Sequence, residues 1–543
     1  MTLQHKIRNT LLLTVLLSAA LYFAEYLLRS ITDITSSQNI SESLQISLML
    51  SLLIVFSTKK FKIFLSAFIS IALIFQSSNA LFYGGWIDPV NLYLFFENLS
   101  EVVNILPKLS LSIILKSLAF IVASIALLYW CYRLAKDSLG YKTANILILL
   151  IFIFQPIRDG LLYPEKIEKR FTKDTHSLIR SFHNSYGIFA SMLISDATGG
   201  NLYSSFRQDE YQDLRNSSSE TPNIFIYFGE SLSSKYMGEY GYHLDTTPII
   251  SQLIEDSNIH ALSKETIAGA AATMPSSVRF FHMIDKPDAR KQASSFNTSL
   301  FRYAKLAGYE TTYLSTQGES YVNHIYKLIA GKYSDYYFTP PLMDSRFNDR
   351  QESDDRLAID QFANLELQEP FFAVLQPNGS HAPFDAKSPS DKKIFGTGTE
   401  LKEYENSVYY TDLNIEAIIE QVKEKSKSKP WIIFITSDHG THVDGKRISR
   451  SLDLPASYMV PGIVLTDSQN IYNTIVKPYA DCKKLFHKNF SEMIAKALHR
   501  DVPIGSCDKG VLFNGLLNGY DSRFVDIDED GAVKLSVFSE TKS

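Results

Sequence analysis

At 543 residues and a net charge of −5, the chain is too long for one ordinary domain and has no excess of positive charge. No basic stretch interleaved with aromatic residues occurs, so we exclude nucleic acid as a partner. Apolar residues dominate about the first 155 positions, whereas the rest has the mixed composition of a globular domain that can bury a core and a ligand pocket.

Five apolar segments predict a helical transmembrane domain over residues 1–155. They are Leu11–Leu28, Leu44–Phe56, Ile63–Phe82, Leu109–Tyr132 and Asn145–Phe154. The second and fifth are shorter than the roughly 20 residues of a span, so their ends must include flanking residues. Lys and Arg cluster before the first segment, between the second and third, and between the fourth and fifth. The positive-inside rule therefore predicts a cytoplasmic N-terminus and places everything after Phe154 outside. A cleaved signal peptide is the alternative for the first segment, because Ser18, Ala19 and Ala20 are small.

Residues 156–220 mix basic and apolar residues, which favours amphipathic bridging helices on the membrane surface. A solvated linker is the alternative for Tyr203–Glu220. Of the three cysteines, Cys131 falls in an apolar segment, whereas Cys482 and Cys507 fall late in the globular part. If that part lies outside the cytoplasm, we expect a disulfide between Cys482 and Cys507, with two unpaired thiols as the alternative.

Residues 221–543 alternate predicted strands and helices, which is typical of an α/β domain with a mainly parallel sheet and helices on both faces. The predicted strands are Asn223–Phe228, Thr311–Ser315, Pro370–Gln376, Trp431–Thr436 and Gly462–Thr466. The predicted helices are Thr247–Asp256, Ser299–Ala307 and Glu405–Lys425.

Two of these strands are continuous apolar runs that end in metal-ligand residues, Glu230 in one case and Asp438 with His439 in the other. Ligands bind beyond the carboxyl ends of strands in open α/β sheets, and carboxylate oxygen and imidazole nitrogen are ligands of zinc. Thr273 follows a run of small residues near a predicted helix start, where free backbone N–H groups can receive an anion. A zinc ion held by Glu230, Asp438 and His439, with the Thr273 hydroxyl as fourth ligand, would activate that hydroxyl as a nucleophile.

Five motifs occur in the order found in the membrane-anchored phosphoethanolamine transferases, which the chain resembles. They are Gly229-Glu230-Ser231, Thr273 followed by Ser276, Gly379-Ser380-His381, Tyr404-x-Asn406-Ser407-x-x-Tyr410-Thr411-Asp412, and Ser437-Asp438-His439-Gly440. These enzymes belong to the alkaline phosphatase and sulfatase superfamily, and the resemblance covers both halves of the chain.

The resemblance implies a zinc-dependent transferase, with manganese as an alternative metal, in the bacterial inner membrane. Residues 221–543 would be a periplasmic catalytic domain. Phosphoethanolamine would pass from phosphatidylethanolamine to Thr273 and then to lipid A, lipopolysaccharide core or a periplasmic glucan. His381 matches the histidine that contacts the phosphoryl group or protonates the leaving alcohol, and Gln317, Asn378 and His442 are predicted substrate-binding residues.

The chain departs from the family pattern at several positions. The cysteines that flank the nucleophile in the lipid A branch are absent, and the nearby position 279 is Arg. Where that branch has a further histidine downstream of the Asp-His pair, this chain has Arg447, Arg450 and Ser451. The sulfatase motif Cys/Ser-x-Pro-x-Arg is replaced by Thr-Met-Pro-Ser-Ser, which disfavours sulfate-ester hydrolysis. A phosphoglycerol transferase, a phosphodiesterase and an inactive membrane scaffold are the rival functions.

Overall fold

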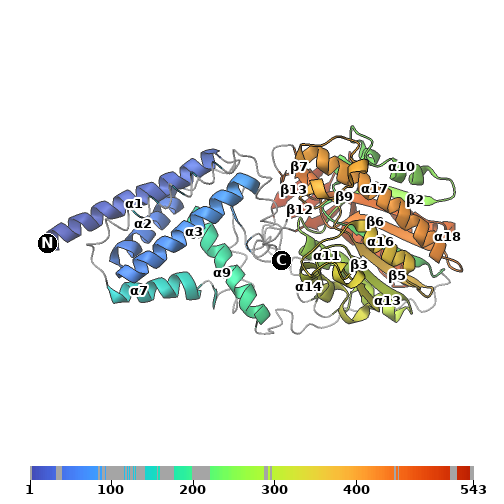
Figure 1. The fold of residues 1–543 in the computed structure, drawn as a ribbon, viewed down its shortest axis with the longest axis horizontal. Coiled ribbons are helices and arrows are strands. Elements are labelled where there is room, and N and C mark those ends of the chain that lie inside the picture. The colour runs from blue at the N-terminus through green and yellow to red at the C-terminus, as the bar shows by residue number, and fades with distance from the viewer. Residues whose placement is uncertain are drawn as a thin grey trace. The chain divides into compact units, whose positions relative to one another are not determined.

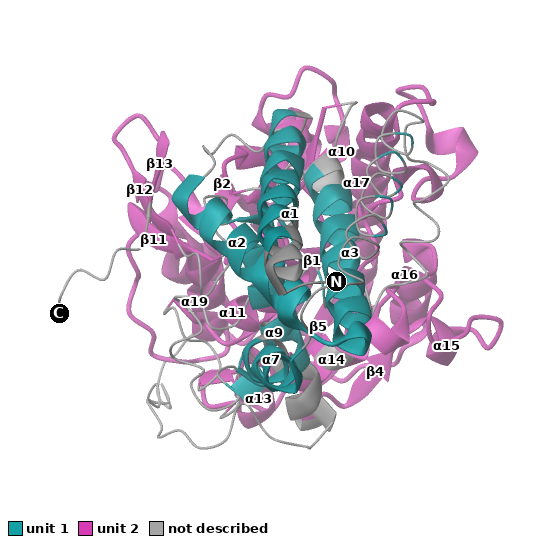
Figure 2. Cartoon of the chain, turned by 90° about the vertical axis from the view of Figure 1, so that its left-hand side faces the viewer, with its two compact units in different colours: residues 1–201 teal, residues 202–543 magenta. Residues whose placement is uncertain are grey.

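The structure, a computed structural model, divides into two compact units, Met1–Asn201 and Leu202–Ser543 (Figure 2). It describes residues 3–31, 40–83, 86–87, 92, 141–155, 157–158, 177–197, 220–285, 292–293, 296–444, 448–449, 452–513 and 523–537, together with five single positions between 115 and 129. Each unit is described by itself.

The first unit consists of helices in its described part. They are α1 (Leu3–Ile31), α2 (Ile40–Phe56), α3 (Lys59–Tyr83), α7 (Lys142–Ile148), which continues as the π-helical turn Leu149–Phe154, and α9 (Leu178–Ala197). Four of the five predicted apolar segments coincide with these helices, and most of the fourth segment, Leu109–Tyr132, lies outside the described residues. Among the described helices, α3 over Lys59–Ala80 is long and apolar enough to cross a membrane, so five spans stay a prediction.

Helix α9 belongs to this first unit and packs against α3 (Figure 1). Its residues Leu178 and Phe182 are buried, and the Phe182 ring meets that of Phe68 at 5.5 Å between centroids. The Gln76 side chain on α3 donates from Nε2 to the Leu178 carbonyl at 3.0 Å. The apolar side chains of Leu178 and Phe182, in the first turns of this helix, are therefore covered by protein. Most of the alternative linker Tyr203–Glu220 lies outside the described residues.

The second unit is built on an eight-stranded sheet with the order β10-β2-β9-β6-β1-β5-β3-β4 (Figure 1). These strands are β1 (Asn223–Gly229), β2 (His260–Ile267), β3 (Glu310–Ser315), β4 (Tyr336–Phe338), β5 (Phe371–Gln376), β6 (Trp431–Ser437), β9 (Met459–Thr466) and β10 (Leu485–Phe486). Neighbours pair in parallel, except that β9 runs antiparallel to both β2 and β6. The prediction of a mainly parallel sheet is confirmed.

Side chains alternate across the sheet, so its central strands contribute to a hydrophobic core on each face. Ile224, Ile226 and Phe228 of β1 enter one core, and Phe225 and Tyr227 enter the other. The first core includes residues of α11 (Thr273–Phe281), α13 (Leu300–Leu306), α14 (Glu319–Ile329) and α19 (His487–Ala497). The second includes residues of α10 (Pro248–Glu255), α16 (Asp355–Asn364) and α17 (Glu400–Lys425). Helices thus cover both faces, as predicted.

All five predicted strands and three predicted helices of this unit are present, with ends shifted by a few residues. The largest shifts extend β9 to Met459 and α17 to Glu400. A small antiparallel sheet of β11 (Lys509–Leu512), β12 (Arg523–Ile527) and β13 (Val533–Val537) and the two-stranded pair β7 (His442–Val443) and β8 (Ile448–Ser449) were not predicted. The structure joins Cys482 to Cys507 in a disulfide, which is the pairing predicted from the sequence.

Candidate metal centre

The centre lies where the neighbouring parallel strands β1 and β6 end. Gly229 pairs with Ser437 in this register, so Glu230 and Asp438 are the next residues on adjacent strands. The chain turns sharply after Glu230, because Ser231 has a φ of 58°, a conformation that residues other than glycine seldom adopt. In this turn the Ser231 N–H donates to Asp438 Oδ1 at 2.9 Å, which ties the two strand ends together.

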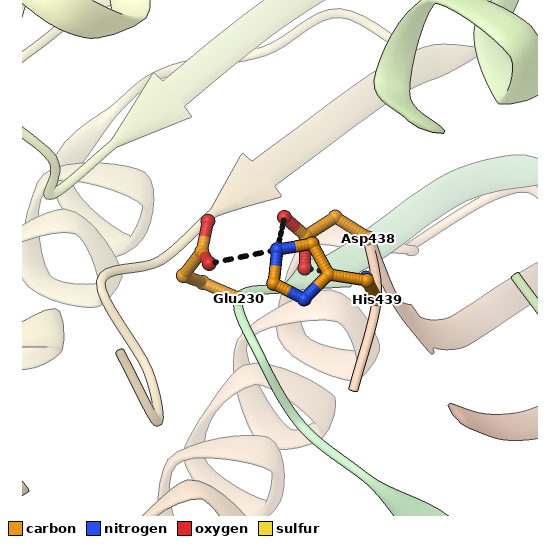
Figure 3. A group of neighbouring side chains, drawn as sticks. All are labelled: Glu230, Asp438 and His439. Atoms are coloured by element: carbon orange, nitrogen blue, oxygen red, sulfur yellow. Dashed lines mark hydrogen bonds and ion pairs between the residues drawn. The ribbon is translucent and has the colours of Figure 1, made fainter. Parts of the chain in front are cut away.

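Glu230, Asp438 and His439 form a group of metal-ligand side chains (Figure 3). All three are buried, and one potential ligand atom from each lies within 4.8 Å of the others. Gly440, the next residue, permits this arrangement because a Cβ there would lie 2.1 Å from the Ala456 carbonyl oxygen. The backbone therefore approaches a neighbouring loop at a distance that only glycine allows.

The protonation state of His439 follows from its hydrogen bond. Its Nδ1 lies 2.8 Å from the Gly440 carbonyl oxygen, which can only accept, so Nδ1 carries the proton. The Nε2 lone pair then faces two carboxylates, at 3.6 Å from Glu230 Oε1 and 3.4 Å from Asp438 Oδ2. Three electron-rich atoms facing one another in a buried space require a cation or a proton between them.

The Asp438 carboxylate also indicates a cation or a proton at this position. Its Oδ1 accepts the backbone N–H groups of Ser231 and His439, whereas its buried Oδ2 has no hydrogen-bond donor among the described residues. Burial raises the pKa of the Asp438 carboxyl, since the charged form loses hydration. An orphaned carboxylate oxygen beside an imidazole lone pair fits a divalent cation bound by oxygen and nitrogen ligands.

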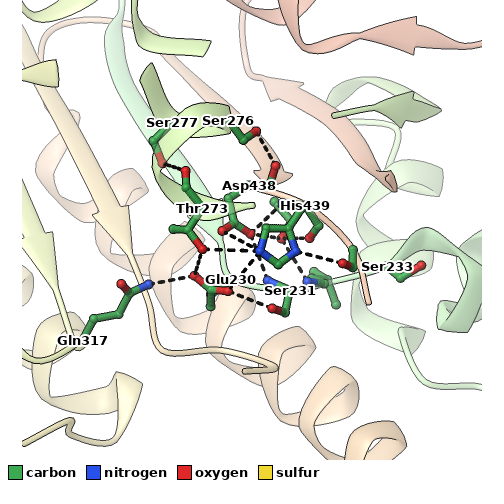
Figure 4. A network of polar contacts seen from close by, with 12 residues as sticks. Glu230, Ser231, Ser233, Thr273, Ser276, Ser277, Gln317, Asp438 and His439 are labelled. Atoms are coloured by element: carbon green, nitrogen blue, oxygen red, sulfur yellow. Dashed lines mark hydrogen bonds and ion pairs between the residues drawn. The ribbon is translucent and has the colours of Figure 1, made fainter. Parts of the chain in front are cut away.

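Thr273 also lies at this centre, although it follows β2, a strand that is adjacent to neither β1 nor β6. It is the first residue of α11, as the sequence predicted, and the preceding Ala272 offers no side-chain cap for the free N–H groups of the helix. The Thr273 hydroxyl donates to Glu230 Oε2 at 3.1 Å and lies 3.3 Å from His439 Nε2 (Figure 4). One hydroxyl therefore contacts two members of the metal-ligand group at a helix start that can receive an anion.

Gln317 and Asn378 follow β3 and β5, at the same edge of the sheet. The Gln317 amide donates from Nε2 to Glu230 Oε2 at 3.2 Å (Figure 4). The Asn378 amide donates from Nδ2 to Glu352 Oε2 at 2.6 Å. Because each nitrogen must face a carboxylate, each amide oxygen faces away from it. Both oxygens are buried without a donor among the described residues, so each keeps an unused hydrogen-bond acceptor.

His381 lies in the loop after β5, and this loop is bonded to the centre because the Ser380 N–H donates to the Glu230 carbonyl at 3.1 Å. Burial alone would raise the pKa of the nearby Glu352 carboxyl, but the positive charges of Lys387 and His381 outweigh it and lower that pKa. His442, on β7, makes its ion contact with Asp444, at 3.7 Å between Nε2 and Oδ2. The roles of His381 and His442 stay predictions.

Two buried residues near the turn before Thr273 were not recognised as parts of this site from the sequence. The Arg279 guanidinium, on α11, lies 3.3 Å over the Phe513 ring. His487, the first residue of α19, accepts a hydrogen bond from the Gly269 N–H, four residues before Thr273. Neither belongs to a motif with a recognisable spacing, so only the fold brings them to the site.

Comparison with known proteins agrees with this geometry. Residues 222–491 match the family model described as Sulfatase. The chain belongs to the alkaline phosphatase/sulfatase superfamily. Its sulfatase-like domain contains β1, β6, α11 and the whole metal-ligand group.

Two curated relatives lie in the same superfamily branch that the motifs indicated. Kdo(2)-lipid A phosphoethanolamine 7''-transferase of Escherichia coli K12 is 24% identical over 372 residues, which cover 63% of each chain. Phosphoethanolamine transferase OpgE of the same organism is 24% identical over 260 residues, or 46% of each chain. The match thus spans less than two thirds of these relatives. The resemblance to phosphoethanolamine transferases is confirmed at the level of family.

A solved structure supports the fold over nearly the whole chain. The integral membrane protein lipooligosaccharide phosphoethanolamine transferase A of Neisseria meningitidis superposes with a TM-score of 0.60. The superposition covers 91% of this chain and 95% of that one, at 15% sequence identity. At this identity the likeness concerns the fold of the two chains.

Proposed function

We propose that this protein is a zinc-dependent transferase that takes phosphoethanolamine from phosphatidylethanolamine and passes it to a periplasmic acceptor. The observation that carries the proposal is the Thr273 hydroxyl, which contacts both Glu230 and His439 at a helix start. The curated relatives named as phosphoethanolamine transferases support the group transferred. Lipid A, lipopolysaccharide core or a periplasmic glucan would be the acceptor.

Glu230, Asp438 and His439 would hold the zinc ion, with Thr273 Oγ1 as the fourth ligand. Two carboxylates, one imidazole and a hydroxyl match the oxygen and nitrogen ligands of zinc, and manganese is the alternative. When bound, the ion lowers the pKa of the hydroxyl and offsets negative charge on the phosphoryl group.

The first half-reaction would join Thr273 Oγ1 to phosphorus and break the bond between phosphorus and the diacylglycerol oxygen. Glu230 Oε2, which already accepts the Thr273 hydroxyl proton in a hydrogen bond, receives that proton. The leaving alkoxide takes a proton from His381, and the free N–H groups at the start of α11 bind the phosphoryl oxygens. The acceptor hydroxyl then attacks the same phosphorus and gives its proton to His381. The bond between phosphorus and Thr273 Oγ1 breaks, and Glu230 returns its proton to that oxygen, which restores Thr273.

Gln317 and Asn378 would bind the donor through the amide oxygens that lack partners among the described residues. His442 is proposed as a further substrate contact at the rim of the site. Residues 1–155 would form the transmembrane domain with about five spans, 156–220 the bridging helices and linker, and 221–543 the periplasmic catalytic domain of an inner-membrane protein. An anchored domain of this kind would reach a lipid head group at the membrane interface.

The test uses the purified full-length protein with vesicles that contain phosphatidylethanolamine labelled in its ethanolamine, or phosphatidylglycerol labelled in its glycerol. Mass spectrometry of the peptide that contains Thr273 should show added phosphoethanolamine, with release of one diacylglycerol. Thr273→Ala should abolish transfer but keep zinc, whereas Glu230→Ala and Asp438→Ala should lose both. A glycerol label on Thr273 would establish the phosphoglycerol rival, and full transfer by Thr273→Ala would end the covalent mechanism.

A further inference from the structure

His487 lies behind the metal centre, and the topology of the sheet explains how it comes there. It directly follows β10, which pairs in parallel with β2 so that Phe486 is opposite Ile267. The chain after Ile267 forms the turn Ala268–Ala272 and then begins α11 at Thr273. His487 therefore lies next to the turn that delivers the Thr273 hydroxyl.

The His487 ring bonds to both sides of the centre. Its Nδ1 accepts a hydrogen bond from the Gly269 N–H at 3.0 Å, and its Nε2 lies 3.3 Å from Thr436 Oγ1. A backbone N–H can only donate, so Nδ1 is unprotonated and Nε2–H donates to Thr436. Gly269 leads to Thr273, and Thr436 leads to Asp438 and His439.

A second contact joins the same two segments. Ser276, on the first turn of α11, places its Oγ 3.4 Å from His487 Nδ1 and donates its hydroxyl hydrogen to the Asp438 carbonyl. The Phe280 ring packs on His487 from one side, at 5.2 Å between centroids. Burial lowers the pKa of His487 to about 3, in agreement with a neutral ring.

We propose that His487 is a positioning residue that holds the Thr273 hydroxyl at its distance from the Asp438–His439 pair. The two contacts of that hydroxyl, at 3.1 and 3.3 Å, are near the outer limit of a hydrogen bond, so a displacement of about 1 Å would break both. A shift of the turn at Gly269 is transmitted directly to α11. This inference rests on the proposed function of Thr273 as the group that reacts beside the metal.

Two substitutions separate the two bonds of the ring. His487→Asn keeps an acceptor near the position of Nδ1 and loses the bond to Thr436. His487→Gln keeps a donor near the position of Nε2 and loses the acceptor for Gly269. If the bond to Gly269 positions Thr273, the Asn variant keeps most of the function and the Gln variant does not.

The first measurement requires no lipid substrate. In full-length protein carrying Thr273→Cys, zinc alone should protect the thiol from alkylation, measured on the peptide by mass spectrometry. Adding His487→Gln should reduce this protection on the order of tenfold, and adding His487→Asn should leave most of it. With phosphatidylethanolamine vesicles and Thr273 restored, His487→Gln should slow diacylglycerol release by roughly 10–100-fold.

His282 provides the matched control, because it is also fully buried with a lowered pKa but bonds to the Leu328 carbonyl. His282→Gln should leave the zinc protection unchanged. Thr436→Val tests the other end of the ring if a His487 variant does not fold, and should reduce protection less than His487→Gln does. Undiminished protection in His487→Gln, or equal losses in the Asn and Gln variants, would overturn the proposal. Absence of diacylglycerol release by the wild type would refute the proposed function. The zinc protection of the thiol would still test the positioning role of His487.

Discussion

Replacing Asp438 by Asn should stabilise the metal-free protein while abolishing its response to zinc. The buried carboxylates of Glu230 and Asp438 have ligand atoms within 4.8 Å of each other. Two unit charges at this distance repel by about 3 kcal/mol at an effective dielectric constant of 20. Asn keeps Oδ1, which accepts from Ser231 and His439, and places an N–H donor where Oδ2 lies 3.4 Å from the His439 Nε2 lone pair. The substitution thus removes a repulsion and gives the orphaned position a partner.

The magnitude is smaller than the full repulsion, since the raised pKa of Asp438 lets the metal-free site take up a proton. We expect a gain of about 1–3 kcal/mol in the free energy of unfolding in EDTA. Zinc should raise the thermal midpoint of the wild type, because an ion that binds only the folded state stabilises it, and should leave the variant unchanged. Differential scanning fluorimetry of full-length protein in detergent, with EDTA or with zinc, measures both effects.

Asp355 is the matched control for this substitution. It is also buried with a raised pKa, but its two oxygens accept from the backbone N–H groups of Asn378 and Gly379, at 2.9 and 3.2 Å. Asp355→Asn places an N–H group against another donor, so it should destabilise the protein by about 1–3 kcal/mol. A loss of stability in Asp438→Asn measured in EDTA, or a zinc response equal to that of the wild type, would refute the reading of this site as a cation centre.

Three further predictions follow from other parts of the catalytic unit. Cys482→Ser should remove the disulfide bond to Cys507 and lower the free energy of unfolding by about 3 kcal/mol, measured by urea unfolding. The wild type should match the variant when reductant is present and should be more stable than the variant without it. Burial lowers the pKa of His282 to about 4, below the value of 6.5 in the unfolded chain. Between these two pH values the unfolded state binds more protons than the folded state. The free energy of unfolding therefore falls as the pH drops from 6.5 to 4. That loss is about 3 kcal/mol, and His282→Gln should flatten the stability curve by that amount; an unchanged slope would contradict it. Gly440→Ala should reduce bound zinc in metal analysis, because the added Cβ would overlap the Ala456 carbonyl and displace the backbone beside His439.

The sequence alone determined the parts of the site that depend on local pattern. β1 and β6 are buried on both faces, so they appear as unbroken apolar runs, and the side chains that follow them must lie at the edge of the sheet. This is why Glu230, Asp438 and His439 were predicted to meet. Thr273 was placed near a helix start because small residues precede it, and the structure begins α11 there. Local rules suffice when a residue's position follows from the end of its own element.

Other features depended on long-range packing that no local pattern shows. β2 contains Lys264 and Glu265 and is only partly buried, so its sequence lacks an apolar run and its strand forms because β9 and β10 pair with it. The antiparallel direction of β9 likewise follows from the path of the chain between β6 and that strand. His487 reaches the turn before Thr273 only because β10 is placed beside β2. Periodicity along a chain shows which face of an element is buried, but the order of the strands is set by the packing of the whole domain. The tertiary structure alone therefore decided which distant residues support Thr273.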